Sequence, residues 1–306
     1  MNAQNKNVAH SATRVAIDKI LSALPAGSPP WARDLVDRLF AGMGHDEIGQ
    51  RRPSAWSALV VGLSDFMRKR VPGETRVRVF DPVLDVNGWE ITPTVVQINM
   101  EDMPFLVDSV SIAIRSRDLN VYRLLHPVMQ VTRDAQGILQ KMDAGPLEAV
   151  MHIEVDRLAD QNECNQLLRD VRKVLDDTRA AVSGWPAMHD RMLELADDLG
   201  QGKLGISIEG GRETEAFLRW VAKNHFTYLG YREYEVERRG KDDEVLSARL
   251  ETGLGILHGK PFFPTRSLKS LTALSLPHSG AIDATPAELT VTVEAASAAP
   301  PVTPVP

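Results

Sequence analysis

The segment from Ile98 to Val131 constrains the fold more than any other part of the chain. It reads INMEDMPFLVDSVSIAIRSRDLNVYRLLHPVMQV. A β-branched apolar run over 94–100 predicts a strand, and an acidic turn with a proline follows it. Apolar residues at helical spacing predict an amphipathic helix over 104–118. Residues 121–132 then return to an extended pattern that is interrupted at Pro127.

The next segments continue this alternation of strands and helices. Residues 148–156 alternate between apolar and polar side chains, which is typical of a half-buried strand. Asp160 to Glu163 resembles a capping box at the start of another helix. The order strand, helix, strand, strand, helix is most of a ferredoxin-like βαββαβ sandwich. Residues 203–208 are a candidate for the missing strand, after a separate helical pattern over 185–199.

A helical region precedes this pattern. Helical spacing of apolar residues predicts helices over 13–24, 31–42 and 54–69. Ser54 is a candidate cap for the third of these helices. The basic stretch Arg68-Lys69-Arg70 suits the negative end of that helix. The fold class is therefore predicted to be α+β, with a helical preface in front of the sandwich.

Composition excludes several functional classes. The 306 residues carry a formal net charge of −6 and show no basic cluster of the kind that a dedicated nucleic-acid-binding protein presents. The single cysteine, Cys164, excludes a disulfide framework and a cysteine metal site. No signal peptide or long apolar run is visible, so we expect no membrane partner and a cytoplasmic location.

The acidic turn is the first candidate site. Glu101 and Asp102 could in principle transfer protons or bind a metal, but no histidine lies near them in sequence. We instead expect Asp102 to cap the following helix, Glu101 to favour its positive end and Pro104 to occupy its first turn. The N–H groups at such a helix start can also hold a carboxylate or phosphate.

Other candidate sites are weaker. His152 lies on the polar side of its strand pattern, where we expect it to be solvated. Cys164 has no matched base and His225 is expected to be structural. The glycine-rich stretch GLGILHG (253–259) lacks the strand and helix that frame a dinucleotide fingerprint. The residues themselves therefore predict no catalytic residue, no metal site and no cofactor bound by this chain.

Four separated stretches resemble one known family. The segment quoted above, together with RVRVFDP (76–82), MHIEVDRL (151–158) and FLRWVAKNHFTYLGYREYE (217–235), is similar to the N-terminal part of the large bacterial NAD-specific glutamate dehydrogenases. The likeness covers about residues 15–258 and occurs in the same order along the chain. It implies an ACT-type fold for about 94–200, in agreement with the βαββαβ pattern.

The resemblance also implies a function. ACT domains bind amino acids or other small effectors at the loop after their first strand, which here places Asp102, Pro104, Phe105 and Leu106 at the effector site. Phe105 stands where that loop normally has glycine, and a bulky side chain there would obstruct a ligand. The parent reaction would convert L-glutamate, NAD and water into 2-oxoglutarate, ammonia and NADH, in a catalytic domain absent from these residues.

We therefore expect a helical segment over 1–73, an ACT-like domain over 74–205, a partial second α+β unit over 212–258 and a disordered Pro/Ala/Thr-rich tail over 260–306. The chain is predicted to be an N-terminal regulatory and assembly segment that self-associates or packs on the rest of the dehydrogenase. The alternative is a free-standing amino-acid sensor or scaffold. A truncated gene explains the tail better than a deliberately short protein.

Overall fold

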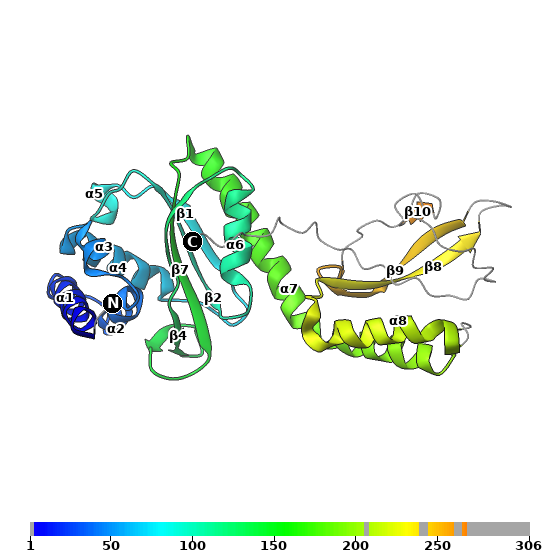
Figure 1. Cartoon of the computed structure of the whole chain (residues 1–306). Helices are drawn as coiled ribbons and strands as arrows, with labels where there is room; N and C mark the ends of the chain where they lie inside the picture. The colour runs from blue at the N-terminus through cyan, green and yellow to red at the C-terminus, as the bar shows by residue number, and fades with distance from the viewer. Residues whose placement is uncertain (1–2, 205–207, 239–243, 260–264, 268–306) are drawn as a thin grey trace. The chain divides into compact units, whose positions relative to one another are not determined.

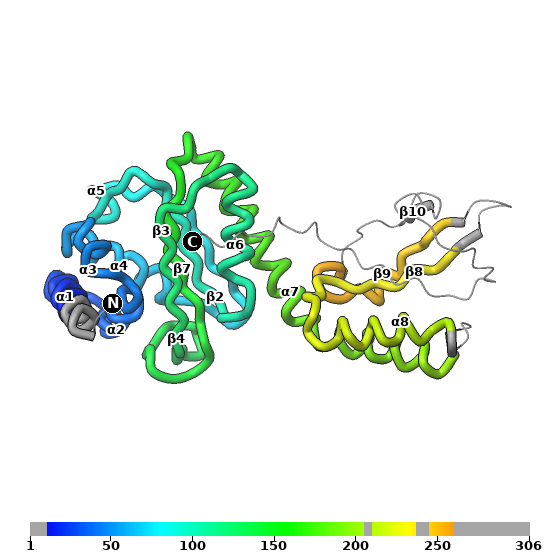
Figure 2. Tube along the Cα trace, viewed as in Figure 1, coloured from blue at the N-terminus to red at the C-terminus, as the bar shows by residue number. Residues whose placement is uncertain are grey.

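A computed structural model describes residues 3–204, 208–238, 244–259 and 265–267 (Figures 1 and 2). The chain forms two compact units, Met1–Asp176 and Asp177–Pro306. The boundary falls inside the long helix α7, Gln161–Gly200. Each unit is described by itself. Within the described residues, the helices are too short or too polar to cross a membrane.

The first unit begins with four helices that pack around one apolar core. They are α1 Ala3–Ser22, α2 Ala32–Phe40, α3 His45–Gly49 and α4 Pro53–Met67. Trp56 of α4 is fully buried and meets the Phe40 ring edge-on at a centroid distance of 5.0 Å. Pro53 occupies the first turn of α4, where its missing N–H costs nothing. The prediction that Ser54 caps α4 is wrong, because the cap residue is Arg52 and no side chain bonds to the free amides.

An antiparallel sheet follows these helices. Its strands are β1 Arg76–Phe80, β2 Thr94–Glu101, β3 Val121–Leu125, β4 Val128–Gln130 and β7 Leu147–Val155. Their order is β1-β2-β7-β3, and β4 also pairs with β7. The short helix α5 (Leu84–Asn87) joins β1 to β2, and a small hairpin of β5 (Thr132–Arg133) and β6 (Leu139–Lys141) lies between β4 and β7.

The predicted order of elements is confirmed as β2, α6 (Leu106–Arg115), β3 with β4, β7 and α7. The missing strand comes from an unexpected place: β1, which precedes β2 in the chain, fills the edge position beside β2. The prediction of a strand over 203–208 is wrong. Residues 203–204 form a turn, Ile208 begins helix α8 and residues 205–207 lie outside the described residues. The predicted separate helix over 185–199 is instead the later part of α7, which continues through Pro186.

Both faces of the sheet are covered, as Figure 1 shows. Val96, Ile98 and Met151 pack on one side in a core shared with α6 and α7. Val95 and Val150, one position along in the same strands, belong to the core of the N-terminal helices. Successive side chains of a strand point to opposite faces, so the polar residues between them lie under those helices and not in water. This burial explains why β2 reads as a nearly continuous buried strand.

The second unit contains the end of α7, helix α8 Ile208–Trp220, a π-helical turn Val221–His225, and a sheet of β8 Gly230–Arg238, β9 Glu244–Gly255 and β10 Thr265–Ser267. The strand order is β10-β9-β8. Leu195 and Leu199 of α7 pack against Leu218 and Val221 in its core. The tail predicted over 260–306 lies outside the described residues apart from β10.

Candidate functional site

The predicted effector loop lies between β2 and α6. Helix α6 begins at Leu106, and its cap position is occupied by Phe105 without any side-chain cap bond. The prediction that Asp102 caps this helix is therefore wrong. Two residues, Met103 and Pro104, separate Asp102 from Phe105, so its carboxylate is too far back in the chain for the cap position. The Asp102 backbone N–H instead donates to the carbonyl of Leu147, which extends the pairing of β2 with β7.

Phe105 has a left-handed backbone, with φ +69° and ψ 6°. Such a conformation is a genuine outlier for a bulky side chain and costs about 1–2 kcal/mol. The loop therefore keeps the backbone geometry that glycine normally provides, although the glycine is absent. The Phe105 side chain is half exposed, whereas Leu106 is buried in the core beneath α6. The four predicted effector residues lie within residues 102–106, and their role in binding an effector stays a prediction.

The Glu101 carboxylate binds the turn that follows α4. Its carboxylate accepts a hydrogen bond of 2.8 Å from Arg70 and one of 2.7 Å from the Gly73 backbone N–H. Burial alone would raise the pKa of Glu101, but these bonds outweigh burial and lower it. The effect of Glu101 on the positive end of the helix stays a prediction; its carboxylate pairs with Arg70 and Gly73. It ties the turn after α4 to the end of β2.

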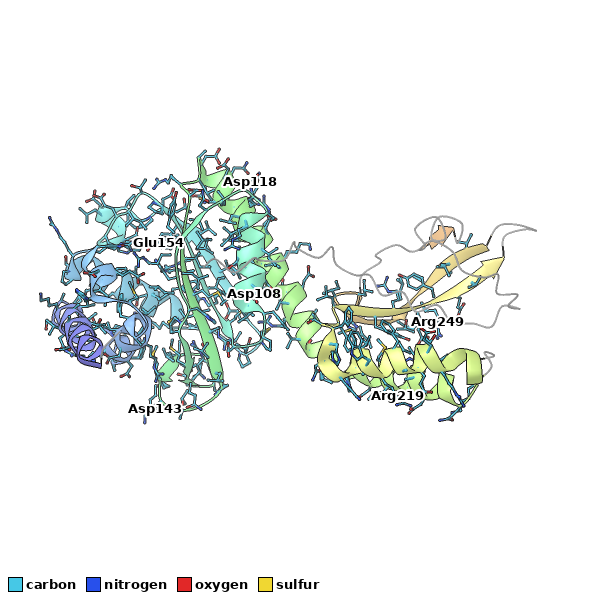
Figure 3. The ribbon with its side chains drawn as sticks, viewed as in Figure 1. Asp108, Asp118, Asp143, Glu154, Arg219 and Arg249 are labelled. Carbon is cyan, nitrogen blue, oxygen red and sulfur yellow. The ribbon has the colours of Figure 1, made fainter. Side chains whose placement is uncertain are left out.

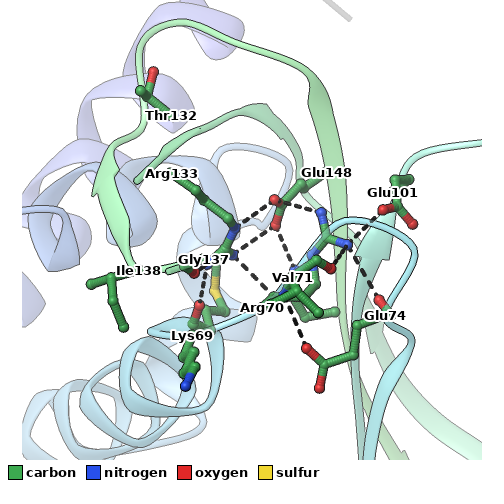
Figure 4. Close-up of polar contacts among 12 residues, drawn as sticks. Lys69, Arg70, Val71, Glu74, Glu101, Thr132, Arg133, Gly137, Ile138 and Glu148 are labelled. Carbon is green, nitrogen blue, oxygen red and sulfur yellow. Dashed lines mark hydrogen bonds and ion pairs between the residues drawn. The ribbon is translucent and has the colours of Figure 1, made fainter. Parts of the chain in front are cut away.

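The centre of this arrangement is Glu148 on β7, whose side chain is 1% exposed (Figure 4). Arg70 and Arg133 each donate to its Oε1 at 2.7 Å, and Arg133 also reaches Oε2 at 2.9 Å. Asn99 on β2 donates to Oε2 at 3.0 Å. Burial by itself would raise the pKa of Glu148, but the bonds from Arg133, Arg70 and Asn99 outweigh it and hold the pKa at about 2. Arg70, predicted only to end a helix, is thus part of a buried ion-pair network.

The turn at Gly137 completes this network. The Gly137 carbonyl accepts from the Arg70 backbone N–H at 3.0 Å and from Nη1 of Arg133 at 2.9 Å. Its φ of +80° is one that glycine adopts freely, and an added Cβ would lie 2.6 Å from the Arg70 carbonyl oxygen. Only glycine fits this position without a backbone shift. Three separate segments therefore converge on Glu148 of β7: the turn after α4, β2 and the β5 hairpin.

A second buried polar cluster surrounds His152, which is fully buried. Arg78 on β1 donates to Oε1 of Gln97 at 2.7 Å, and Nε2 of Gln97 lies 2.9 Å from Nδ1 of His152. Because the amide nitrogen of Gln97 is a donor, Nδ1 of His152 accepts and its proton sits on Nε2. That Nε2 is 3.2 Å from Oε1 of Glu154. The prediction of a solvated His152 is wrong, and burial lowers its pKa so that the neutral ring is favoured.

Glu154 joins this cluster to the helices. Arg51, which follows α3, donates to its Oε2 at 2.5 Å. Burial would raise the pKa of Glu154, but His152 and Arg51 outweigh burial and hold it at about 2. Figure 3 labels Glu154 beside the N-terminal helices and Asp108 on α6, on the other side of the sheet. Arg51 also stacks over the Trp56 ring at 4.6 Å, so the cluster links α3 and α4 to β7.

These two clusters form a polar layer between the sheet and the N-terminal helices. The carboxylates of Glu148 and Glu154 are paired in these clusters, which is the condition under which buried charges are tolerated. No three His, Cys, Asp or Glu side chains within the described ranges are grouped as metal ligands. Cys164 is buried in the apolar core of α7 and the sheet, and burial raises the pKa of its thiol. Sequence reasoning missed this layer, although Glu148, His152 and Glu154 repeat at even spacing on one strand. The sequence feature that indicates this burial is the predicted N-terminal helical region, because its apolar side chains need a surface such as a sheet face to pack against.

Comparison with known proteins agrees with this fold. Residues 35–171 match the family model of the glutamate dehydrogenase ACT1 domain. An NAD-specific glutamate dehydrogenase of Pseudomonas aeruginosa is 32% identical over 214 residues, which is 68% of this chain and 13% of that protein. One of Halomonas elongata is 30% identical over 223 residues, 69% of this chain and 14% of that protein. One of Mycobacterium tuberculosis is 26% identical over 204 residues, 63% of this chain and 12% of that protein. The chain thus spans only a small part of these relatives.

Proposed function

We propose that this chain, which belongs to the NAD-specific glutamate dehydrogenase family as an N-terminal segment with its ACT1 domain, acts in regulation and assembly and not in hydride transfer. The family reaction, oxidation of L-glutamate to 2-oxoglutarate and ammonia with NAD as the hydride acceptor, would take place outside these residues. We propose that this chain itself binds no cofactor and works in the cytoplasm.

The observation that carries the assembly role is the outer face of α6. Ile112 is 67% exposed and Phe105, two helical turns before it, is 50% exposed. Residues seven apart lie on one side of a helix, and Phe105 occupies the cap position seven residues before Ile112, so we infer that these two large apolar side chains contribute to one surface. Between them lies Ser109, a small residue that does not interrupt close packing. We call Phe105, Ser109 and Ile112 the α6 face.

The strain at Phe105 supports this role. Strained backbone persists where the surroundings require it, and it concentrates at functional positions. An exposed aromatic ring at a position that favours glycine lowers the stability of the fold, and burial within the described residues does not offset this loss because the ring is half exposed. Contact with a second copy of the chain, through the same face on both copies, would bury the ring and offset the strain. The alternative partner of this face is the rest of a dehydrogenase.

An effector function for the loop remains a second proposal. Asp102, Pro104, Phe105 and Leu106 would then contact a small amino acid, as the family resemblance implies. This proposal predicts saturable binding of an amino acid that raises the melting temperature of the chain. Phe105→Gly would strengthen such binding, because it removes the side chain beside the loop.

Sedimentation velocity over a range of protein concentrations tests the assembly role. We expect concentration-dependent dimers for the wild type and monomers for Ile112→Glu, since a charge at the centre of an apolar contact is strongly unfavourable. Val86→Glu is the matched control, because Val86 is 78% exposed and lies on α5, away from the α6 face. A monomeric wild type, or equal dimer formation by Ile112→Glu, would refute self-association through this face.

A further inference from the structure

A cavity of about 330 Å³ opens in the first unit between α4, α5 and β1. Its wall contains apolar groups from Val61, Phe80 and Trp89 together with the polar side chains of Ser54 and Asn87. The volume is at the lower end of the range for small-molecule sites. The cavity lies on the side of the sheet that carries the polar layer, and so it is separate from the loop before α6.

Arg78 supplies the positive charge of this cavity. Its Nε donates to Gln97 at 2.7 Å and its Nη2 to the Gly62 carbonyl at 3.0 Å. Among the described residues, no carboxylate forms an ion pair with Arg78 and no acceptor bonds its Nη1. Every other arginine in the polar layer, such as Arg51 and Arg70, is paired with a glutamate.

The surroundings of Arg78 favour an anion. The rings of Phe66 and Phe80 lie 4.7 and 4.8 Å from its guanidinium carbon, so little water reaches the charge from those sides. Burial and, to a smaller extent, Arg76 lower the pKa of Arg78 to about 10, while the nearby Asp65 carboxylate acts in the opposite direction. Asp65 also lines the cavity, but its carboxylate is engaged by Arg68.

Two further donors lie in the same wall. Asn87 uses its Oδ1 to accept the Val83 backbone N–H at 2.9 Å, which leaves its amide N–H groups available. The Ser54 hydroxyl has no hydrogen bond to a described residue. A ligand with oxygen acceptors would therefore find a guanidinium, an amide and a hydroxyl in one apolar-walled cavity.

We propose that this cavity binds a small carboxylate, with Arg78 holding the carboxylate group and Asn87 and Ser54 contacting its other oxygens. A planar carboxylate suits the guanidinium fork, and the apolar wall suits a short carbon chain. An ammonium group is not required, because the only carboxylate in the wall is already paired. The site goes beyond the assembly role and does not depend on it.

The bound ligand would also contact the polar layer through Arg78. The chain of hydrogen bonds from Arg78 through Gln97 and His152 to Glu154 and Arg51 runs from the cavity to the end of α3. A carboxylate on Nη1 would polarise this chain from one end. Occupancy of the cavity would therefore alter the hydrogen bonds that join the sheet to the end of α3.

Isothermal titration of the whole chain with 2-oxoglutarate, and separately with inorganic phosphate, tests the proposal. We expect saturable binding of 2-oxoglutarate that is roughly tenfold weaker in Arg78→Met, because a charge-assisted hydrogen bond is lost. Arg76→Met is the matched control, since Arg76 lies on the same strand and contacts the same Phe66 ring but does not line the cavity. It should bind within about twofold of the wild type.

A second pair of variants avoids the buried strand, in case Arg78→Met fails to fold. Val86 lines the cavity and is 78% exposed, so substitutions there leave the core intact. Val86→Glu should weaken 2-oxoglutarate binding roughly threefold or more through charge repulsion, whereas the equally sized Val86→Gln should not. Ile112→Glu should bind normally, which separates this site from the α6 face.

Three results would overturn the proposal. The first is no saturable binding of 2-oxoglutarate by the wild type. The second is equal binding by the wild type and Val86→Glu. The third is phosphate binding as tight as that of 2-oxoglutarate, which would assign the cavity to oxyanions in general and not to carboxylates. In each case the sedimentation result for the α6 face would stand on its own.

Discussion

Replacement of Glu148 by glutamine should destabilise the first unit strongly at neutral pH. Glutamine keeps the shape of the side chain but removes the charge that Arg70 and Arg133 share. Folding lowers the pKa of this carboxyl from 4.5 to about 2. A shift of one pKa unit corresponds to about 1.4 kcal/mol, so the charged interactions of Glu148 contribute about 3 kcal/mol to the free energy of unfolding. Its side chain is 1% exposed, so screening by solvent is weak.

The pH dependence of the effect follows from the direction of the pKa change. A carboxyl whose pKa is lower in the folded state stabilises the fold above its unfolded pKa, and this contribution is lost as the pH falls through the folded pKa. The difference in unfolding free energy between wild type and Glu148→Gln should therefore be about 3 kcal/mol at pH 7. It should shrink between about pH 4.5 and pH 2, where the wild-type carboxyl also becomes neutral.

Urea unfolding followed by tryptophan fluorescence measures this difference. Trp185 and Trp220 lie in the second unit, and their replacement by phenylalanine leaves Trp31, Trp56 and Trp89 to report on the first unit. Glu154 titrates in both proteins, so its contribution cancels in the comparison.

Glu101→Gln is the control, because Glu101 contacts the same Arg70 but is 32% exposed, and its loss should cost less than about 1 kcal/mol. A difference for Glu148→Gln that stays the same from pH 7 to pH 2, or that is below about 1 kcal/mol at pH 7, would refute the reasoning.

Three further predictions concern single backbone and loop positions, each measured by the same urea unfolding. Phe105→Gly should be more stable than Phe105→Ala by about 1 kcal/mol, because only glycine relieves the left-handed strain; equal stabilities would contradict that strain. Asp102→Ala should change stability by less than about 0.5 kcal/mol, since Asp102 caps no helix; a loss above about 1 kcal/mol would restore the capping role. Gly137→Ala should cost at least about 2 kcal/mol, because its Cβ would meet the Arg70 carbonyl; a near-neutral result would mean that the turn moves freely.

The order of elements could be predicted from the sequence because each element carries a local signal. The run from Thr94 to Met100 has the β-branched composition of a strand, and the periodicity that begins at Leu106 predicts a helix. The edge strand β1 could not be placed in the same way. Its pairing with β2 is a tertiary contact, and no local pattern tells which edge Arg76–Phe80 will fill.

The candidate site was harder to predict, because its meaning depends on what covers the strand. Alternation on β7 correctly separates Met151 and Ile153 from Glu148 and His152. Alternation alone, however, cannot distinguish a polar face in water from a polar face under helices. The arginines that pair these residues come from segments as far away as Arg51 and Arg70. The predicted capping role of Asp102 is wrong because the helix begins at Leu106, after the left-handed Phe105, and the sequence pattern does not show this start.

Crosslinking through a single engineered thiol tests the assembly role most directly. Cys164 is 3% exposed and is the only native cysteine, so Ile112→Cys adds one reactive thiol on the α6 face. Val86→Cys places a thiol at a position that is at least as exposed, elsewhere on the first unit. With a short bismaleimide, we predict covalent dimers of Ile112→Cys at a concentration where Val86→Cys stays monomeric. Equal crosslinking of the two variants, or none in either, would contradict self-association through the α6 face.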